Sequence, residues 1–329
     1  MNRSLLLSLL MLTAAPVPAG PVSEEASPER QRRADVPQEF DTRWIATRPR
    51  TPEGVYPNLP ADWVPLPNDR YEVPDGQPLA GVRICVDAGH GGQIWGPTRG
   101  YTAGTRGVNT GLTESEANLR TALFLWDLLT QAGAEVTMTR VREDRLTPAP
   151  ASPDYDGRFE ELHIRDDIAE AAGCDYFLAI HHNAPGGNQP DLNYTAVYYF
   201  DTAHYDAEYN AAPRYGPRHP DEELTAERVS LARHIQRALS ERLGLPVIPI
   251  APGSENDMGH EVPHGDYHVI REIDIPAVLI ECSFMTNPDE DLRLNDPARA
   301  KAEAIGIFEG LLAHFRENPP RPWSERRSQ

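Results

Sequence analysis

Apolar residues between positions 81 and 316 recur with two spacings, one typical of strands and the other of helices. Short β-rich or wholly apolar runs occur at 82–87, 134–140, 175–182, 197–200 and 277–282. Longer segments with helical spacing occur at 119–129, 164–172, 226–243 and 298–315. Strands that alternate with helices predict a single α/β domain with a twisted, largely parallel central sheet flanked by helices on both faces.

The segments outside this domain differ from it. Residues 1–19 combine a basic start, a short apolar run and small residues before Ala19, which is typical of a secretory signal peptide cleaved after Ala19. The apolar run is too short to span a membrane, and no cysteine follows it to carry a lipid anchor. The alternative is a buried N-terminal helix. We therefore expect an exported protein, periplasmic or extracellular, with no membrane anchor after signal cleavage.

Proline-rich segments mark the remaining boundaries. Residues 20–80 hold 11 of the 32 prolines and have no sustained periodicity, so we interpret them as a leader. Residues 317–329 are a second, short proline-rich tail. The sequence thus predicts one domain, over residues 81–316, which is large enough to be a catalytic domain.

Composition excludes several classes of function. The chain has 31 Lys and Arg against 50 Asp and Glu, a net charge of −19, whereas a nucleic-acid or anionic-membrane binder needs a basic face. Hydrophobic residues make up 40% of the chain, which is enough for a real core. Cys85, Cys174 and Cys282 are too few for a disulfide scaffold and fall in or beside apolar strands, so we expect core residues rather than ligands.

Three of the predicted strands end in side chains that can bind a metal ion or work beside one. His90 follows the first strand, His181 and His182 end the third, and Glu281 lies in the last, otherwise apolar strand. The carboxyl ends of parallel strands meet at one edge of the sheet, where ligands bind. Two imidazoles and one carboxylate with an open position form a catalytic zinc set, and a second carboxylate can act as general base.

Strand alternation separates the two adjacent histidines. Phe177, Ala179 and His181 share one face of the predicted strand, and His182 lies on the other. Only one of the two can therefore face a given ion, and the spacing alone does not say which.

Glu114 is the best candidate for the carboxylate ligand. Thr113 and Glu116 form a capping box, in which the Thr113 hydroxyl accepts from the Glu116 amide and the Glu116 carboxylate returns to the Thr113 amide. Glu116 thereby has a structural role, and Glu114 is left to project from the start of the helix. A favourable charge at the helix N-terminus is the alternative explanation for Glu114.

Two further interpretations stay open. The glycine-rich run 89–92 could cradle a phosphate, although no Gly-Lys-Ser/Thr follows it. Glu281 could form a buried ion pair with Arg165 or Arg271, because an ionised carboxylate in an apolar strand is costly without a partner.

Three histidines spaced by four, His260, His264 and His268, invite a helical metal site. Gly259, Pro263 and Gly265 interrupt the stretch, so no regular helix can align them. We expect a loop close to the site.

Four sequence blocks occur in order: Ile-Cys-Val-Asp-Ala-Gly-His-Gly-Gly at 84–92, Gly-Leu-Thr-Glu-Ser-Glu-Ala-Asn-Leu at 111–119, a strand with two histidines at 175–184, and Pro-Ala-Val-Leu-Ile-Glu at 276–281 with Asn-Pro at 287–288. In these blocks the chain resembles the zinc-dependent N-acetylmuramoyl-L-alanine amidases, the amidase type 3 family of cell-wall hydrolases. The resemblance extends over residues 81–315.

The resemblance implies a role for each candidate residue. It implies that His90, Glu114 and His181 bind one zinc ion per chain and that Glu281 is the catalytic carboxylate, which selects His181 over His182. His182 itself departs from the family pattern, which usually has alanine there.

The resemblance also implies a substrate. We expect hydrolysis of the amide between N-acetylmuramic acid and the L-alanine of the stem peptide, in intact peptidoglycan or in muropeptides, during cell-wall degradation. The alternatives are a zinc peptidase that cuts the stem peptide and an inactive wall-binding module with the same fold. The long stretches 91–111 and 185–221 should border the cleft. The sequence does not indicate an activator protein. If a segment of the chain blocked the active site and an activator removed it, we would expect that segment within 185–221.

Overall fold

The structure is a computed structural model, which describes residues 72–74, 76–91, 103–141, 146, 158–185, 189–204 and 220–320. In chain order its elements are β1 (Arg83–Ala88), α4 (Glu114–Gln131), β2 (Glu135–Met138), α5 (Arg158–Ala171), β3 (Tyr176–Asn183), β4 (Ala196–Tyr199), η2 (Thr202–His204), α6 (Glu222–Leu243), α7 (His268–Arg271), β5 (Ala277–Phe284), α8 (Pro288–Leu294) and α9 (Pro297–Glu317). The expected signal peptide 1–19, the leader up to residue 71 and the tail from residue 321 lie outside the described residues.

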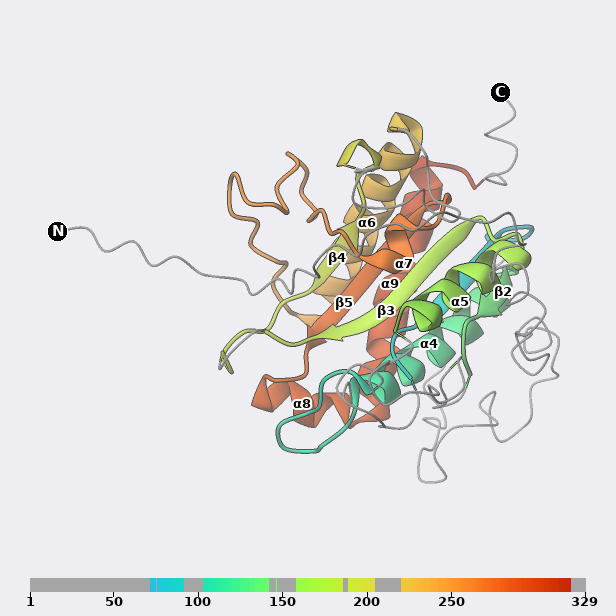
Figure 1. Cartoon of the computed structure of the whole chain (residues 1–329). Helices are drawn as coiled ribbons and strands as arrows, with labels where there is room; N and C mark the ends of the chain where they lie inside the picture. Colours follow the sequence, from blue (N-terminus) through green and yellow to red (C-terminus); the bar gives the residue numbers. More distant parts are fainter. Residues whose placement is uncertain are drawn as a thin grey trace, which may run out of the picture.

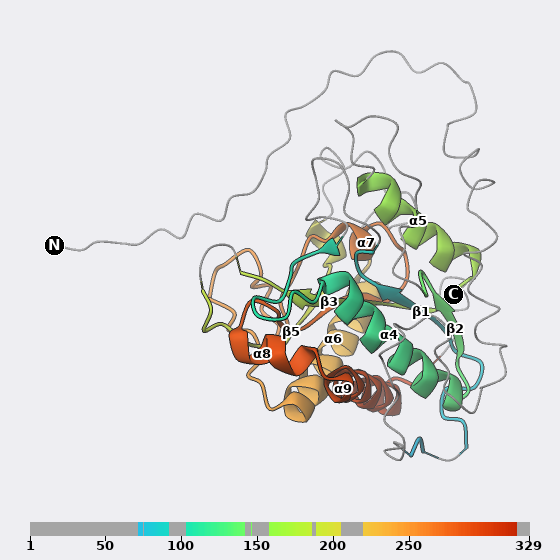
Figure 2. The same ribbon diagram turned by 90° about the horizontal axis from the view of Figure 1, so that it is seen from below.

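The strands form one five-stranded sheet in the order β2-β1-β3-β5-β4 (Figure 1). Strands β2, β1, β3 and β5 are parallel, and the edge strand β4 is antiparallel to β5. Figure 2 shows α5 and α7 on one face of the sheet and α4, α6 and α9 on the other. The predicted single α/β domain with a largely parallel sheet and helices on both faces is confirmed.

Strand alternation divides the core into two parts. Ile84 and Leu178 belong to the larger cluster, which packs under α4, α6 and α9. Cys85 and Phe177 belong to the smaller cluster on the opposite face. The three cysteines are buried and free, as predicted.

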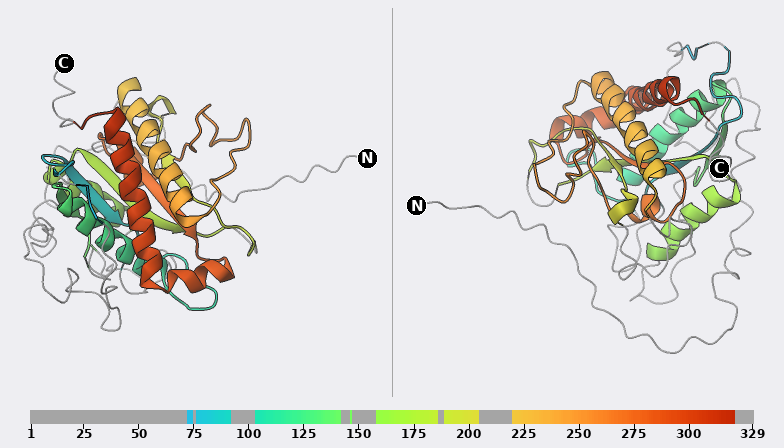
Figure 3. Two further views of the ribbon diagram at one scale, coloured as in Figure 1. Left: turned by 180° about the vertical axis from the view of Figure 1, so that it is seen from behind. Right: turned by 90° about the horizontal axis from the view of Figure 1, so that it is seen from above.

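Helices α6 and α9 run side by side across the back of the sheet (Figure 3). Gly306 and Gly310 of α9 allow this close approach, because a Cβ on Gly310 would lie 2.5 Å from the Cα of Ile235. A buried histidine–carboxylate pair also joins the two helices, with Nε2 of His314 3.1 Å from Oε1 of Glu227.

The boundaries of the domain and of some elements differ from the predictions. Leu79, assigned to the leader, is completely buried and belongs to the main core, so the folded unit begins before residue 81. Helix α5 begins at Arg158 rather than near residue 164, and the short helices α7 and α8 were not predicted. Within the stretch 185–221, by contrast, the edge strand β4 confirms the strand predicted at 197–200. Among the described residues, no helix has both the length and the apolar character needed to cross a bilayer.

We predict that Gly310→Ala destabilises the fold. A helical Gly→Ala change ordinarily gains about 1 kcal/mol in helix propensity. Here the new methyl group would meet the backbone of Ile235 and the carbonyl oxygen of His234, at 2.5 and 2.8 Å, and overpacking of this kind costs roughly 1–3 kcal/mol. The free energy of unfolding, measured by urea denaturation, should fall. A variant as stable as the wild type, or more stable, would contradict this close packing.

Candidate active site

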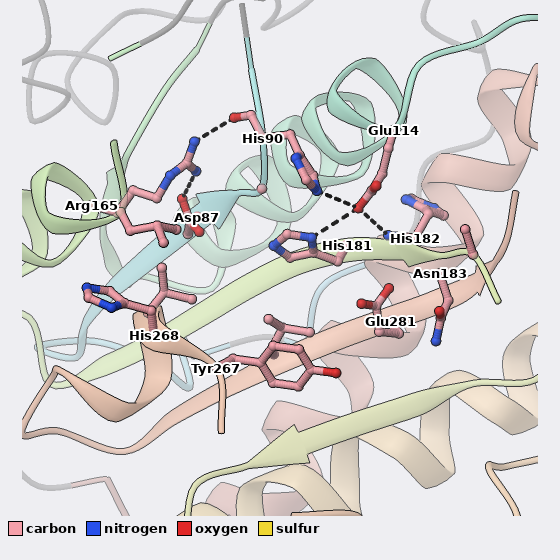
Figure 4. A pocket seen from close by; sticks show the side chains of 15 residues that line it. Asp87, His90, Glu114, Arg165, His181, His182, Asn183, Tyr267, His268 and Glu281 are labelled. Carbon is pink, nitrogen blue, oxygen red and sulfur yellow. Dashed lines mark hydrogen bonds and ion pairs between the residues drawn. The ribbon is translucent and has the colours of Figure 1, made fainter. Parts of the chain in front are cut away.

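The carboxyl ends of β1, β3 and β5 open into a cleft of ≈ 370 Å³ (Figure 4). Its lining includes all four residues singled out from the sequence, namely His90, Glu114, His181 and Glu281. Other side chains around it come from α5, α7 and the end of β3, among them Arg165, Asn183, Tyr267 and His268. The cleft thus lies where an open parallel sheet ordinarily binds its ligand.

Glu114 is the centre of a compact cluster. Its Oε1 atom lies 3.2 Å from Nε2 of His90 and 3.0 Å from Nδ1 of His181. One ligand atom from each of the three residues lies within 4.8 Å of the others (Figure 4). The structure therefore brings together a carboxylate and two imidazoles from three separate elements, β1, α4 and β3.

The charges in this cluster suit metal binding. Burial opposes ionisation of Glu114, but the positive charge of His90 and hydrogen bonds from His181 and His90 hold the pKa of Glu114 well below its ordinary value. Burial lowers the pKa of His181, which favours the neutral ring that a metal ion needs. A carboxylate that stays ionised and imidazoles that can offer a lone pair form a donor set typical of catalytic zinc.

Glu281 lies on β5 directly beside His181 of β3 in the sheet register. Its Oε2 atom is buried and has no hydrogen-bond partner among the described residues. Burial and then the nearby charge of Glu114 raise the pKa of Glu281 well above its ordinary value. An acid in this state is suited to proton transfer rather than to a structural ion pair.

The alternative prediction, an ion pair between Glu281 and Arg165 or Arg271, is wrong. Arg165 instead pairs with Asp87. Arg271 pairs with Asp266 and Glu272. Neither guanidinium neutralises the Glu281 carboxylate.

Local backbone contacts explain why Glu114 points into the cleft. Thr113 caps α4 by accepting a hydrogen bond from the Glu116 amide at 3.3 Å, as predicted. The Glu116 carboxylate, expected to return to the Thr113 amide, pairs with Arg120 one turn later. The amide of Thr105 donates to Oε2 of Glu114 at 3.1 Å, and this leaves Oε1 for the two histidines.

The end of β1 is held by two buried arginines. Arg140 donates to the carbonyls of Ala88 and Gly89, at 2.7 and 2.9 Å, and also to that of Ser115 in α4. Arg165 donates to the carbonyls of Ala88 and His90. His90 has a φ of 60°, in the left-handed region that costs a non-glycine residue roughly 1–2 kcal/mol. The arginines therefore fix a strained residue that carries one of the cluster's imidazoles.

Gly89 is needed for the same geometry. A Cβ at this position would lie 2.2 Å from Nε2 of His181, so any side chain would displace the imidazole. The close approach of His181 thus explains Gly89, the first glycine of the run after β1, without a phosphate cradle.

His181 and His182 face opposite sides of the sheet, as alternation predicted. The ring of His181 lies in the cleft, whereas the ring of His182 contacts Asn118 and Glu303 in the interior. Burial opposes ionisation of Glu303, but the charge and hydrogen bond of His182 hold the pKa of Glu303 below its ordinary value. The ring of His182 therefore binds interior side chains, although the residue also borders the cleft.

The three histidines spaced by four do not form one site. His260 and His264 pack against the ring of Tyr199 and do not line the cleft. His268 begins the short helix α7 and does line it, with its ring 4.8 Å from that of His163. No regular helix aligns the three histidines, as predicted, but the expectation that the stretch lies close to the site holds for His268 and not for His260 and His264.

Several residues around the cleft had no assigned role in the sequence analysis. Arg140 ends an apolar strand, and Glu303 lies among alanines and isoleucines on the apolar stripe of α9. A charged residue at such a position signals a buried partner, although it does not say which one. Tyr267, 37% exposed at the wall of the cleft, carried no such signal.

Comparison with known families gives a match over most of the predicted domain. Residues 84–313 match a family model described as N-acetylmuramoyl-L-alanine amidase. The germination-specific N-acetylmuramoyl-L-alanine amidase of Bacillus subtilis is 26% identical over 255 residues, which cover 77% of this chain and 88% of that protein. The amidase LytC of the same organism is 27% identical over 239 residues, which cover 73% of this chain but only 36% of LytC.

Solved structures share the fold. The CwlD amidase of Clostridioides difficile, solved in complex with the GerS lipoprotein, has a TM-score of 0.52 and 22% identity, and the match covers 72% of this chain and 99% of CwlD. The amidase Ami1 of Mycobacterium smegmatis has a TM-score of 0.51 and 21% identity, with 73% of this chain and 99% of Ami1 covered.

We predict that Arg140→Met destabilises the protein strongly. The substitution removes one donor from each of the carbonyls of Ala88, Gly89 and Ser115. A hydrogen bond from a charged donor contributes about 1.5–3 kcal/mol, so loss of three such bonds should lower the free energy of unfolding by roughly 3 kcal/mol or more, even though Arg165 and Asn118 still donate to two of the carbonyls. Chemical denaturation measures the loss.

Arg237→Met is the matched control for this variant. Arg237 and its partner Glu241 are both well exposed on α6, and an exposed pair contributes at most about 1 kcal/mol. Equal losses for the two variants would show that the end of β1 does not depend on Arg140.

Proposed function

The chain belongs to the N-acetylmuramoyl-L-alanine amidase family, and from this premise we propose that it is an exported, zinc-dependent enzyme whose active site is the cleft at the ends of β1, β3 and β5. As a member of the family it is a hydrolase that acts on peptidoglycan. The observation that carries the proposed site is the buried carboxylate of Glu114 between two imidazoles, with Glu281 on the neighbouring strand.

We propose that His90, Glu114 and His181 hold one zinc ion. The fit rests on three features of the cluster: its nitrogen and oxygen donors, their mutual separation within 4.8 Å, and the lowered pKa of the buried His181 ring. Zinc, when bound, supplies Lewis acidity toward the attacking water and the scissile carbonyl.

Glu281 is the proposed general base. Its buried Oε2 makes no hydrogen bond within the part of the chain that the structure describes, so it can accept a proton from the attacking water. The same oxygen can then deliver this proton to the nitrogen of the departing L-alanine. The raised pKa of Glu281 makes its carboxylate a stronger base toward this water than an ordinary exposed glutamate would be.

The order of segments in the chain supports export. We propose a signal peptide at 1–19 and a proline-rich leader from residue 20, followed by the catalytic domain, with the enzyme acting in the periplasm or outside the cell at the wall. The curated relatives include proteins named cell wall amidases, which is consistent with this location.

Digestion of purified sacculi tests the proposed reaction. The full chain with zinc should release stem peptides and create new amino-terminal L-alanine, detected by amino-group labelling and mass spectrometry, while the glycan chains stay intact. A chelator should stop the release, and added zinc should restore it.

Other products would contradict the proposal. Release of carboxy-terminal amino acids would identify a peptidase of the stem peptide. Absence of any product, together with absence of bound zinc, would identify a wall-binding module.

We predict that Glu281→Gln abolishes hydrolysis while zinc stays bound. The amide cannot take a proton from water, and loss of a general base costs about 10²–10⁴-fold in rate. Turnover of a muramyl-peptide and zinc content by elemental analysis should be measured on the same preparation. Glu241→Gln, on the exposed side of α6, is the control and should be fully active. Near-normal turnover by Glu281→Gln would refute the assigned base.

A further inference from the structure

His182, which follows the proposed ligand His181, is the centre of a buried polar network. Its Nδ1 lies 2.7 Å from Oδ1 of Asn118, and its Nε2 lies 3.1 Å from Oε2 of Glu303. The side chains of His182 and Glu303 are fully buried. Such an arrangement next to the cleft has an energetic cost, because burying ionisable groups is unfavourable unless each of them is paired.

Each nitrogen of the His182 ring contacts a defined oxygen atom. Asn118 donates through Nδ2 to the carbonyl of Gly89 at 3.0 Å, so its Oδ1 atom must be the acceptor that faces His182. Oε2 of Glu303 is also an acceptor, and it takes a further hydrogen bond from Thr121 at 2.7 Å. Both nitrogens of His182 therefore face oxygen atoms, one on α4 and one on α9, and the ring joins these two helices to the end of β3.

The same contacts decide against a second metal site. His182, Cys282 and Glu303 are close enough together to hold an ion. Both ring nitrogens of His182, however, already lie within hydrogen-bond distance of Asn118 and Glu303. The guanidinium of Arg299 lies 3.6 Å from Oε1 of Glu303 and also pairs with Glu290, so the charge of the Glu303 carboxylate is balanced within the protein.

The backbone at His182 needs an anchor of this kind. The register between β3 and β5 shifts between His181 and Asn183, so the regular ladder is interrupted at the residue that follows His181. A strand irregularity of this type redirects neighbouring side chains and leaves the local backbone less fixed by the sheet. The side chain of His182 restores the constraint by binding α4 and α9.

We propose that His182 and Glu303 are positioning residues for the zinc site, an inference that rests on the proposed zinc ligands. The pair fixes the end of β3 and thereby His181. Through Asn118 it also reaches the carbonyl of Gly89, which precedes His90. Asn118 and Thr121 lie on α4, the helix that begins with Glu114. One buried pair thus connects the three elements that supply the cluster's donors.

The chain offers a matched control for this proposal. His314 and Glu227 form a second buried pair with the same 3.1 Å separation, and His314 lies on α9, as Glu303 does. This second pair joins α9 to α6 and contacts none of the three donors. Glu303→Gln and Glu227→Gln therefore remove the same charge from similar surroundings, one beside the site and the other remote from it.

The test is zinc affinity of the metal-free full chain, measured by competition with a chromophoric chelator. We expect Glu303→Gln to weaken zinc binding roughly 10–100-fold, the usual effect of losing a group that orients metal ligands. Glu227→Gln should stay within about twofold of the wild type, although both variants lower the melting temperature. The visible spectrum of the cobalt-substituted protein should change only for Glu303→Gln, because it reports the geometry of the donors.

Two results would overturn the inference. One is unchanged zinc affinity in Glu303→Gln, and the other is equal weakening in both variants, which would mean that affinity simply follows stability. If Glu303→Gln does not fold, Thr121→Val removes one donor to the same carboxylate and should still weaken zinc binding measurably; unchanged affinity in that variant would overturn the inference as well. Failure of the wild type to bind zinc would instead refute the proposed function.

Discussion

Two buried guanidinium groups hold the end of β1, and the site depends on them. The pairing of β1 with β2 ends at Val86 and Met138. The carbonyls at the end of β1 therefore need other hydrogen-bond donors, because an unpaired carbonyl away from water is costly. Arg140 and Arg165 supply these donors from β2's side of the sheet and from α5. Because several hydrogen bonds act on three successive carbonyls, His90 can be kept in a left-handed conformation that it would not adopt alone. Strain at a candidate ligand is thus balanced by contacts outside the cleft.

Because side chains alternate between the two faces of β3 and β5, adjacent residues at the ends of these strands lie on opposite faces of the sheet. His181 and Glu281 face the cleft, and His182 and Cys282 face the larger core. The core face can accept the polar ring of His182 because Asn118 and Glu303 bind its two nitrogens, and Arg299 lies beside the Glu303 carboxylate. Pairing of this kind seldom adds much net stability, since desolvation consumes most of the attraction. The effect of these contacts is instead to fix the end of β3 in one position relative to α4 and α9.

The features that the sequence predicts are those set by local or periodic constraints. Period-two alternation over 177–182 placed His181 and His182 on opposite faces, and capping at Thr113 left Glu114 to point outward. The partners of Asn118 and Glu303 could not be predicted, because His182 lies 64 and 121 residues away from them along the chain. Competition between partners explains the other wrong prediction. The Glu116 carboxylate forms an ion pair with Arg120, one turn along the helix, instead of accepting a hydrogen bond from the Thr113 amide. Helix α8 did have a local signal, Asn287 at the cap followed by Pro288, but it lacked an apolar period.

The charge of the chain limits how such a site can recognise its substrate. A net charge of −19 repels an anionic wall polymer, and salt screens this repulsion beyond about 8 Å at physiological ionic strength. The buried arginines do not reverse it, because Arg165 is committed to Asp87 and to backbone carbonyls. Attraction must therefore come from short-range contacts inside the cleft, where neutral groups such as Tyr267 and Asn183 stand beside the candidate metal ligands. Binding of this kind selects the bond to be cut by the shape and polarity of its surroundings, and it does not depend on the protein being held to the wall by charge.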